Sequence, residues 1–182
     1  DLVYIASERL TKQVSEKIMV PVKPLLQCTD EQVMTYSDSS SLKYELLFIG
    51  NSRGVFRKII RDLLPTEHKL TVYGRAWDKY IPSKYIAGTY YDNAKIGQAY
   101  HDAAIVLNDH WDDMKEMGII SNRLFDALAA EGFVISDDIP EIKEVFDGAV
   151  VTYSNREDLK NKISLYGWKQ LEEKMLLSIV GE

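Results

Sequence analysis

Four residues near the middle of the chain have the types and the spacing that phosphate and sugar chemistry requires. Ser121, Asn122 and Arg123 stand at the expected start of a helix, and Asp126 follows one turn later. A helix N-terminus presents free N–H groups and a partial positive charge, which suit a bound anion. Asp126, about 5 Å further along the axis, could accept two hydrogen bonds from a ribose diol. On spacing alone, an ordinary solvated aspartate explains Asp126 equally well.

Arg123 adds a fixed cation in the first turn of this helix, where the helix dipole disfavours positive charge. A negatively charged ligand would supply the missing compensation. The alternative is a surface arginine whose aliphatic stem lies on the sheet. Both interpretations remain open from the sequence.

The elements around these residues predict where they lie. Ala103 to Leu107 is a short apolar run typical of a buried strand, and a polar loop follows it. Ser121 is the expected N-cap of a helix that ends at Gly132, and Phe133 to Ile135 form the next strand. Such a unit points a helix N-terminus at the carboxyl ends of a parallel sheet.

Strands and helices alternate along most of the chain. This alternation predicts an α/β fold with a Rossmann-like, doubly wound parallel sheet. We expect the other strands at residues 45–49, 69–73, 85–90 and 149–153, and the other helices at 55–64, 93–101, 139–146 and 155–166.

The first 40 residues differ from the rest. They are expected to form a strand at 2–6, a helix from Ser7 to about Ile18 and an extended stretch at 20–26, followed by a polar linker from Asp30 to Ser41. We predict a boundary near Ser41, with 1–40 the remnant of a preceding domain plus linker and 41–182 a second domain. No nearby strand accompanies the first one, so a piece of a longer protein is expected. Gly167 to Val180 reads as an amphipathic helix that packs on a neighbouring domain or chain.

Composition and charge limit the partners and the location that we expect. The net charge is −6 and no long basic run exists, so nucleic acid is not expected as a partner. Residues 43–84 nevertheless hold nine Lys and Arg against four Asp and Glu, a local positive field that suits a small phosphate ligand. The single cysteine, Cys28, indicates a reducing, cytoplasmic compartment. No apolar run approaches the roughly 20 residues of a membrane span.

The sequence of the turn after the first strand of the main domain argues against two common phosphate-binding motifs. Gly50-Asn51-Ser52-Arg53-Gly54 matches neither the glycine fingerprint of dinucleotide folds nor the loop of nucleoside triphosphatases. What remains is a site with this turn, and with Arg53 and Arg57 or Lys58, on one side. The helix that begins at Ser121 would form the other side.

Metal and nucleophile chemistry are not expected. Asp109, His110, Asp112 and Asp113 are close in sequence, but their order fits neither a calcium loop nor a paired-histidine zinc site. No Gly-x-Ser-x-Gly elbow is present, which argues against acyl transfer. Of the three histidines, only His110 lies in the loop that leaves the key strand.

The run VLNDHWDDMKEMGIISNRLFDALAAEGFVISDD at 106–138, preceded by YELLFIGN at 44–51 and LTVYGRAWDKY at 70–80, resembles a known family. It is similar to the C-terminal, donor-binding half of two-domain, GT-B type group 1 glycosyltransferases, in the branch that includes spore-maturation-type proteins. DLVYIAS through LLQCTD, residues 1–30, resembles the end of that family's first domain. The resemblance covers about residues 1–165 in order.

The resemblance implies roles for individual residues. Arg53 and Arg57 or Lys58 would face a diphosphate together with the helix start at Ser121, and Asp126 would hold the ribose. The loop from Gly88 to Tyr91 would line the base, and His110 and 118–120 would lie beside the donor sugar. The residues assigned to catalysis are Arg53, Arg123 and His110, and those assigned to donor binding are Gly50, Asn51, Arg57, Lys58, Gly88, Tyr91, Gly118, Ile119, Ile120, Ser121, Asn122 and Asp126. One departure from the family is Gly118, which stands where relatives often carry an acid.

The resemblance further implies a metal-independent, hexosyltransferase-like enzyme that needs no cofactor and moves a sugar from a nucleotide-diphosphate donor to a saccharide or other acceptor. It implies a place in cell-surface polysaccharide synthesis and peripheral membrane association of the full-length protein. The acceptor domain would be largely missing, so the fragment is expected to bind donor weakly and to transfer no sugar alone. The alternatives are a non-catalytic nucleotide or nucleotide-sugar binding module and a flavodoxin-like regulatory domain. The second would need an acidic cluster where the first strand ends in Gly50 and Asn51.

Overall fold

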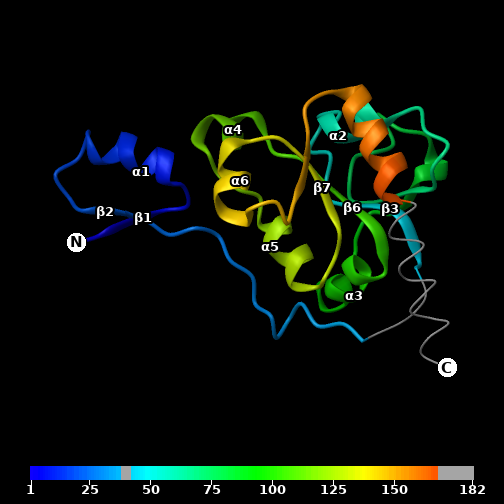
Figure 1. Cartoon of the computed structure of the whole chain (residues 1–182), viewed down its shortest axis with the longest axis horizontal. Coiled ribbons are helices and arrows are strands. Elements are labelled where there is room, and N and C mark those ends of the chain that lie inside the picture. Colours follow the sequence, from blue (N-terminus) through cyan, green and yellow to red (C-terminus); the bar gives the residue numbers. More distant parts are fainter. Residues whose placement is uncertain (38–41, 168–182) are drawn as a thin grey trace.

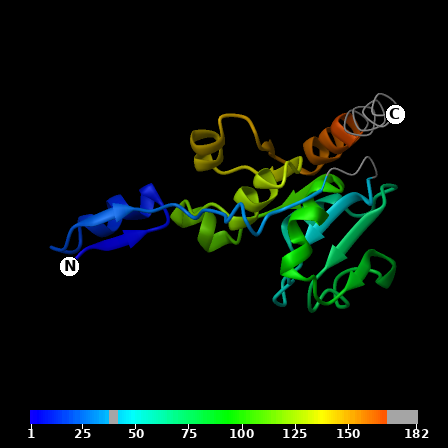
Figure 2. The same cartoon turned by 90° about the horizontal axis from the view of Figure 1, so that it is seen from below.

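A computed structural model describes residues 1–37 and 42–167 of the chain. Its main part is a six-stranded parallel sheet with helices on both faces (Figures 1 and 2). The strands of this sheet are β3 (Tyr44–Ile49), β4 (Leu70–Tyr73), β5 (Ile86–Gly88), β6 (Ala103–Asn108), β7 (Val134–Asp137) and β8 (Val151–Tyr153). The helices between them are α2 (Lys58–Leu63), α3 (Ile96–His101), α4 (Asp112–Met117), α5 (Asn122–Ala129) and α6 (Pro140–Phe146), with short 3-10 turns η1 (Ser83–Tyr85) and η2 (Asn93–Lys95).

The strand order across the sheet is β5-β4-β3-β6-β7-β8. Counted from β3, this is 3-2-1-4-5-6, the order of doubly wound dinucleotide-binding folds. The predicted Rossmann-like, doubly wound parallel sheet is therefore confirmed. The order reverses between β3 and β6, which pair in parallel with Leu46 beside Ile105 and Leu47 beside Val106. At such a switch point the loops after the two strands diverge and leave room for a ligand.

Alternation along the central strands builds two apolar layers. Leu46 and Phe48 of β3 face one layer with α2, and Leu47 faces the other. The first layer also receives the helix that runs from residue 156 to the last described residue, 167. The second receives α3, α5 and α6. All six residues of β6 are buried, as expected for a central strand covered on both faces.

The first 25 residues form a small unit beside this domain (Figure 1). β1 (Val3–Ile5) pairs in parallel with β2 (Val22–Pro24), and α1 (Glu8–Ser15) connects them. Ser7 caps α1, as predicted, because its hydroxyl accepts a hydrogen bond from the amide of Leu10 at 3.1 Å. The expectation that no strand accompanies the first one was wrong, since Val22 lies opposite Val3.

Several predicted bounds differ from the structure. The polar loop after β6 contains the short helix α4, whose two aspartates in the first turn suit a helix start but resemble loop residues in sequence. α2 begins at Lys58 instead of Val55, and β5 ends at Gly88 instead of Tyr90. α5 ends at Ala129, before the expected stop at Gly132. The proposed boundary at Ser41, and the helix expected beyond Gly167, lie outside the described residues.

Candidate functional site

A cavity of about 240 Å³ opens where β3 and β6 end, at the switch point of the sheet. Ligands of open α/β sheets bind at this position. Its walls come from the turn after β3, the loop after β6, α4 and the start of α5. The lining residues are Gly50, Asn51, Arg53, Arg57, Asp109, Trp111, Met114, Ser121 and Arg123. The structure thus brings together six of the residues predicted from the sequence: Gly50, Asn51, Arg53, Arg57, Ser121 and Arg123.

Arg57 is held firmly by Asp109 at one wall of the cavity. The guanidinium binds both carboxylate oxygens of Asp109 and donates to its backbone carbonyl at 2.8 Å. Both side chains are buried, with 6% and 1% exposed. Burial lowers the pKa of the Arg57 guanidinium, and the adjacent carboxylate opposes this shift. The second oxygen of Asp109 also accepts from the Ile59 amide at 3.4 Å, which places negative charge at the start of α2.

Arg53 is held much more loosely than Arg57. The guanidinium carbon of Arg53 lies 5.4 Å from the centre of the Trp111 ring, and that of Arg57 lies 3.9 Å from the same ring. Both distances allow cation–π attraction. Within the described residues the Arg53 guanidinium makes no hydrogen bond or ion pair, and the residue is exposed. Arg53 can therefore turn toward an anion without breaking a stronger contact.

Arg123 reaches from the first turn of α5 to the ends of the two central strands. Its guanidinium donates to the carbonyl of Ile49 at 2.7 Å and to the side-chain oxygen of Asn108 at 2.8 Å. Its guanidinium carbon lies 4.7 Å from the centre of the Phe48 ring. These neutral partners position the cation, but no carboxylate among the described residues forms a salt bridge with it. The charge of Arg123 thus has no carboxylate partner at the cavity wall, and its contact with an anion stays a prediction.

His110 contacts the start of α5 and lies outside the cavity lining, and its predicted place beside a bound sugar stays a prediction. Its side chain is fully buried, with Nδ1 2.7 Å from Asp137 and Nε2 accepting the Ser121 amide at 3.0 Å. An imidazole that accepts a backbone N–H at Nε2 carries its proton on Nδ1, where it donates to the carboxylate. Both ring nitrogens are therefore engaged. His110 also removes the Ser121 amide from the donors available to a ligand, so an anion at this helix start must use the amides of Asn122 and Arg123.

Asp126 lies outside the cavity lining. The Asn122 side-chain amide donates to both of its carboxylate oxygens, at 3.1 and 2.9 Å, on the outer side of α5. The predicted one-turn spacing between the helix start and Asp126 is thus present. The ribose contact that the sequence suggested stays a prediction, because a diol at Asp126 would have to replace the Asn122 amide.

The remaining predicted residues lie away from the cavity. Lys58 forms an ion pair with Asp62 and sits 4.8 Å from the Tyr153 ring, so it points to the side of α2. Gly88 ends β5, and Tyr91 packs edge-on against Tyr73 with 4.7 Å between ring centres. This packing against Tyr73 is an ordinary structural role for Tyr91.

Residues 118–120 connect α4 to α5. Gly118 ends α4 with φ +68°, a conformation that favours glycine. A Cβ atom there would lie 2.4 Å from a carboxylate oxygen of Glu141, so a side chain at this position would require that carboxylate to move. Ile119 is half-buried, and Ile120 is buried in the layer with α3 and α5.

Sequence reasoning did not assign Asn108, Asp109, Trp111 or Asp137 to the site. The available signal was their position at the end of β6 or β7, or in the loop after β6, since the carboxyl ends of neighbouring parallel strands meet at one edge. Asp137, the last residue of β7, is 2% exposed and receives hydrogen bonds from the backbone and ring of His110.

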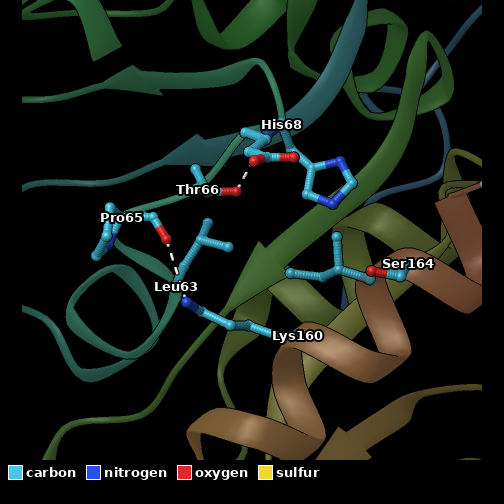
Figure 3. A pocket seen from close by; sticks show the side chains of 8 residues that line it. Leu63, Pro65, Thr66, His68, Lys160 and Ser164 are labelled. Atoms are coloured by element: carbon cyan, nitrogen blue, oxygen red, sulfur yellow. Dashed lines mark hydrogen bonds between the residues drawn. The ribbon is translucent and has the colours of Figure 1, made fainter.

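A second hollow of about 420 Å³ lies between the end of α2 and the helix from residue 156 (Figure 3). Its basic groups already have partners. Lys160 donates to the Pro65 carbonyl at 3.2 Å, and His68 lies 2.6 Å from Glu45. The hollow lies next to the residues that enter β4, at the edge opposite the switch point. It therefore offers less to an anion than the cavity between β3 and β6.

The described part of the chain has neither a cluster of metal ligands nor a membrane-spanning helix. In residues 1–37 and 42–167, no three His, Cys, Asp or Glu side chains are grouped so that they could hold a metal ion. The helices of the same part of the chain include none with the length and apolar character needed to cross a membrane.

Comparison with known proteins gave a family match. A sequence model described as glycosyl transferase-like matches residues 53–176, more than half of the chain. A comparison with curated proteins found no match. Among solved structures, the chain is similar to one in the crystal structure of the GtfA/B complex, at 15% identity and a TM-score of 0.49. That similarity covers 96% of this chain and 42% of the other, so this chain spans less than half of the length of that one.

Proposed function

The chain belongs to the glycosyl transferase-like family, and from this premise we propose that its switch-point cavity binds the diphosphate of a nucleotide-sugar donor. One observation carries the proposal. Three arginines line the cavity against a single carboxylate, Asp109, which already neutralises Arg57. Arg53 and Arg123 are left to attract a ligand with two negative charges.

Glycosyl transfer would be favoured by the positive charge of Arg53 and Arg123. Breaking the bond between sugar and phosphate develops negative charge on the leaving diphosphate, and preorganised donors stabilise it. Arg123 is preorganised by Ile49 and Asn108. Arg53 would close on the diphosphate from the opposite wall, and the free amides at the start of α5 would complete the contact. These groups can support the departure of the diphosphate without a metal ion.

The size of the cavity indicates which part of the donor it holds. Sites that enclose a drug-sized ligand have volumes of roughly 300 to 1,000 Å³. At about 240 Å³, this cavity suits the diphosphate but not a whole nucleotide-sugar. We propose that the chain forms the C-terminal, donor-binding half of a GT-B type enzyme and that an acceptor domain supplies the second wall. Such a wall would also exclude water, which would otherwise hydrolyse the donor.

The other predicted residues receive revised roles in this proposal. Asp126 would bind the ribose diol after exchange of its Asn122 contact. His110 becomes a positioning residue, since its ring nitrogens are engaged by Asp137 and Ser121. Transfer of a hexose, a saccharide acceptor, cytoplasmic location and a place in cell-surface polysaccharide synthesis rest on the sequence resemblance alone.

One observation favours a second candidate, a non-catalytic nucleotide or nucleotide-sugar binding module. Among the nine residues that line the cavity, Asp109 is the only carboxylate, and no histidine is present. The cavity therefore offers no evident general base. A module of this kind would bind the same diphosphate but would support neither transfer nor donor hydrolysis, even when an acceptor domain is supplied.

Calorimetric titration with uridine, guanosine and cytidine diphosphates tests the proposal. We expect heat with at least one diphosphate and its loss in Arg123→Ala. Arg61→Ala is the matched control, because Arg61 lies on α2 outside the cavity and its side chain is 58% exposed. Equal binding by both variants, or no binding by the unmodified chain, would contradict the diphosphate site.

A further inference from the structure

We propose that Ser7 and Arg9 of the N-terminal unit position the switch-point cavity through α4. This inference rests on the proposed function, since it assigns positioning residues to the same diphosphate site. α4 stands between α1 and the sheet, and α1 lies beside its end in both views (Figures 1 and 2). The side of α4 toward the sheet lines the cavity, and its C-terminal end is held by α1.

The contacts at the C-terminal end of α4 are specific. Ser7 donates its hydroxyl hydrogen to the carbonyl of Met117. Arg9 donates to the carbonyls of Lys115 at 3.1 Å and Glu116 at 3.4 Å. The last carbonyls of a helix have no partner within it and form the negative end of its dipole, so a guanidinium is a favourable partner. Gly118 caps α4 through the backbone, and α1 adds side-chain partners to the last carbonyls of the helix.

Glu141 of α6 completes this junction. One of its carboxylate oxygens lies 2.6 Å from Arg9, and the residue is 9% exposed. The same oxygen is 2.4 Å from the position that a Cβ atom on Gly118 would occupy, and the Ser7 hydroxyl is 3.2 Å from that position. Side chains of α6 and of the α1 N-cap thus meet closely at Gly118, the end of α4. A displacement of α1 would disturb these contacts at the end of α4.

α4 contributes to the site by lining the cavity and by binding Asp137. Trp111, the N-cap of α4, and Met114 line the cavity. Lys115 binds the buried carboxylate of Asp137 at 2.6 Å, and Asp137 in turn holds the ring of His110. His110 then accepts the Ser121 amide at the start of α5.

A continuous series of hydrogen bonds and ion pairs therefore runs from Arg9 to the helix N-terminus of the diphosphate site. α4 has only six residues, Asp112 to Met117, so contacts at its two ends are one and a half turns apart. A shift of Met117 is therefore transmitted to Trp111 and, through Lys115, to Ser121. Couplings carried by such packed networks change affinity by about 2- to 30-fold.

Arg9→Ala tests the coupling, with Lys12→Ala as the matched control. Lys12 is an exposed cation on the same helix. The first readout is hydrogen exchange of the Ser121 amide, which requires no ligand. We expect Arg9→Ala to speed this exchange about tenfold, with the increase confined to α4 and the start of α5. A mere loss of stability would instead speed exchange in β3 and β6 as well, and unchanged exchange at Ser121 would overturn the inference.

The second readout is the dissociation constant of the nucleoside diphosphate that binds the unmodified chain. We expect it to rise about 3- to 10-fold in Arg9→Ala and to stay constant in Lys12→Ala. Glu141→Gln keeps the shape of the junction and removes one charge, so it should give a smaller change in the same direction. Faster exchange with an unchanged dissociation constant would overturn the positioning role. Absence of binding by the unmodified chain would contradict the proposed function, and the exchange of Ser121 would still decide the coupling.

Discussion

The Nη2 atom of Arg123 lies 2.6 Å from the position that a Cβ atom on Gly50 would occupy. Glycine at the end of β3 is therefore what allows the guanidinium to reach the Ile49 carbonyl at 2.7 Å. The turn after β3 and the start of α5 lie far apart in sequence, and this contact joins them into one wall.

Gly50→Ala should displace Arg123 and weaken diphosphate binding about tenfold, or about 1.4 kcal/mol. Calorimetric titration of the variant measures this change. Gly148→Ala is the control, since Gly148 has φ +91° and a Cβ atom added there would meet no atom within 4 Å beyond its chain neighbours. It should lose stability through backbone strain without a change in affinity. Unaltered affinity in a folded Gly50→Ala protein would show that Arg123 does not bind the ligand.

Asp109→Asn should destabilise the protein by about 3–5 kcal/mol, because it leaves the Arg57 guanidinium buried without its counter-charge. Urea denaturation measures the free energy of unfolding. Asp62→Asn removes the partner of the partly exposed Lys58 and should cost about 0–1 kcal/mol. Similar effects of the two substitutions would contradict the structural role of the buried pair.

The fold was predictable because its signals are local. Ala103 to Leu107 is a continuous apolar run, and strands of this kind alternate with helices along the chain. The short helix α4 escaped prediction because six residues hold too little of a helical period to distinguish a helix from a polar loop.

Part of the site was predictable, because some of its signals are also local in sequence. Arg123 and Ser121 could be placed because a helix start has a sequence signature. The pairing of Asp109 with Arg57 and of Asp137 with His110 could not be predicted, because it depends on which side chains the sheet brings together. His110 resembled a catalytic residue for the same reason, since its contacts with Asp137 and Ser121 involve residues 27 and 11 positions away.

The carboxylate of Asp137 should make stability depend on pH. Burial raises its pKa, but hydrogen bonds from His110 and the contact with Lys115 outweigh burial and hold the pKa below the usual 3.8. Since the folded pKa is lower than the unfolded one, the stabilisation is fully present above about pH 4 and is lost as pH falls through the folded pKa. Asp137→Asn should therefore flatten the decline of unfolding free energy below about pH 4. Urea denaturation at a series of pH values measures this slope, and the exposed neighbour Asp138 provides the control, Asp138→Asn. A slope in Asp137→Asn equal to that of the unmodified protein would be evidence against an ionised Asp137 in the fold.

Arg53 should contribute to ligand binding and not to stability, whereas the buried Arg57 should contribute mainly to stability. The Arg53 guanidinium lies 5.4 Å from the centre of the Trp111 ring and is free to move toward a diphosphate. Arg53→Ala should raise the dissociation constant about tenfold, since an arginine–phosphate contact is charge-assisted, and should change the unfolding free energy by less than about 0.5 kcal/mol. Because Trp111 loses this cation when ligand binds, its fluorescence should change on titration with the diphosphate, and Trp111→Phe should abolish the signal. A signal of the same size in Arg53→Ala would mean that another group produces it, and an unchanged dissociation constant would remove Arg53 from the site.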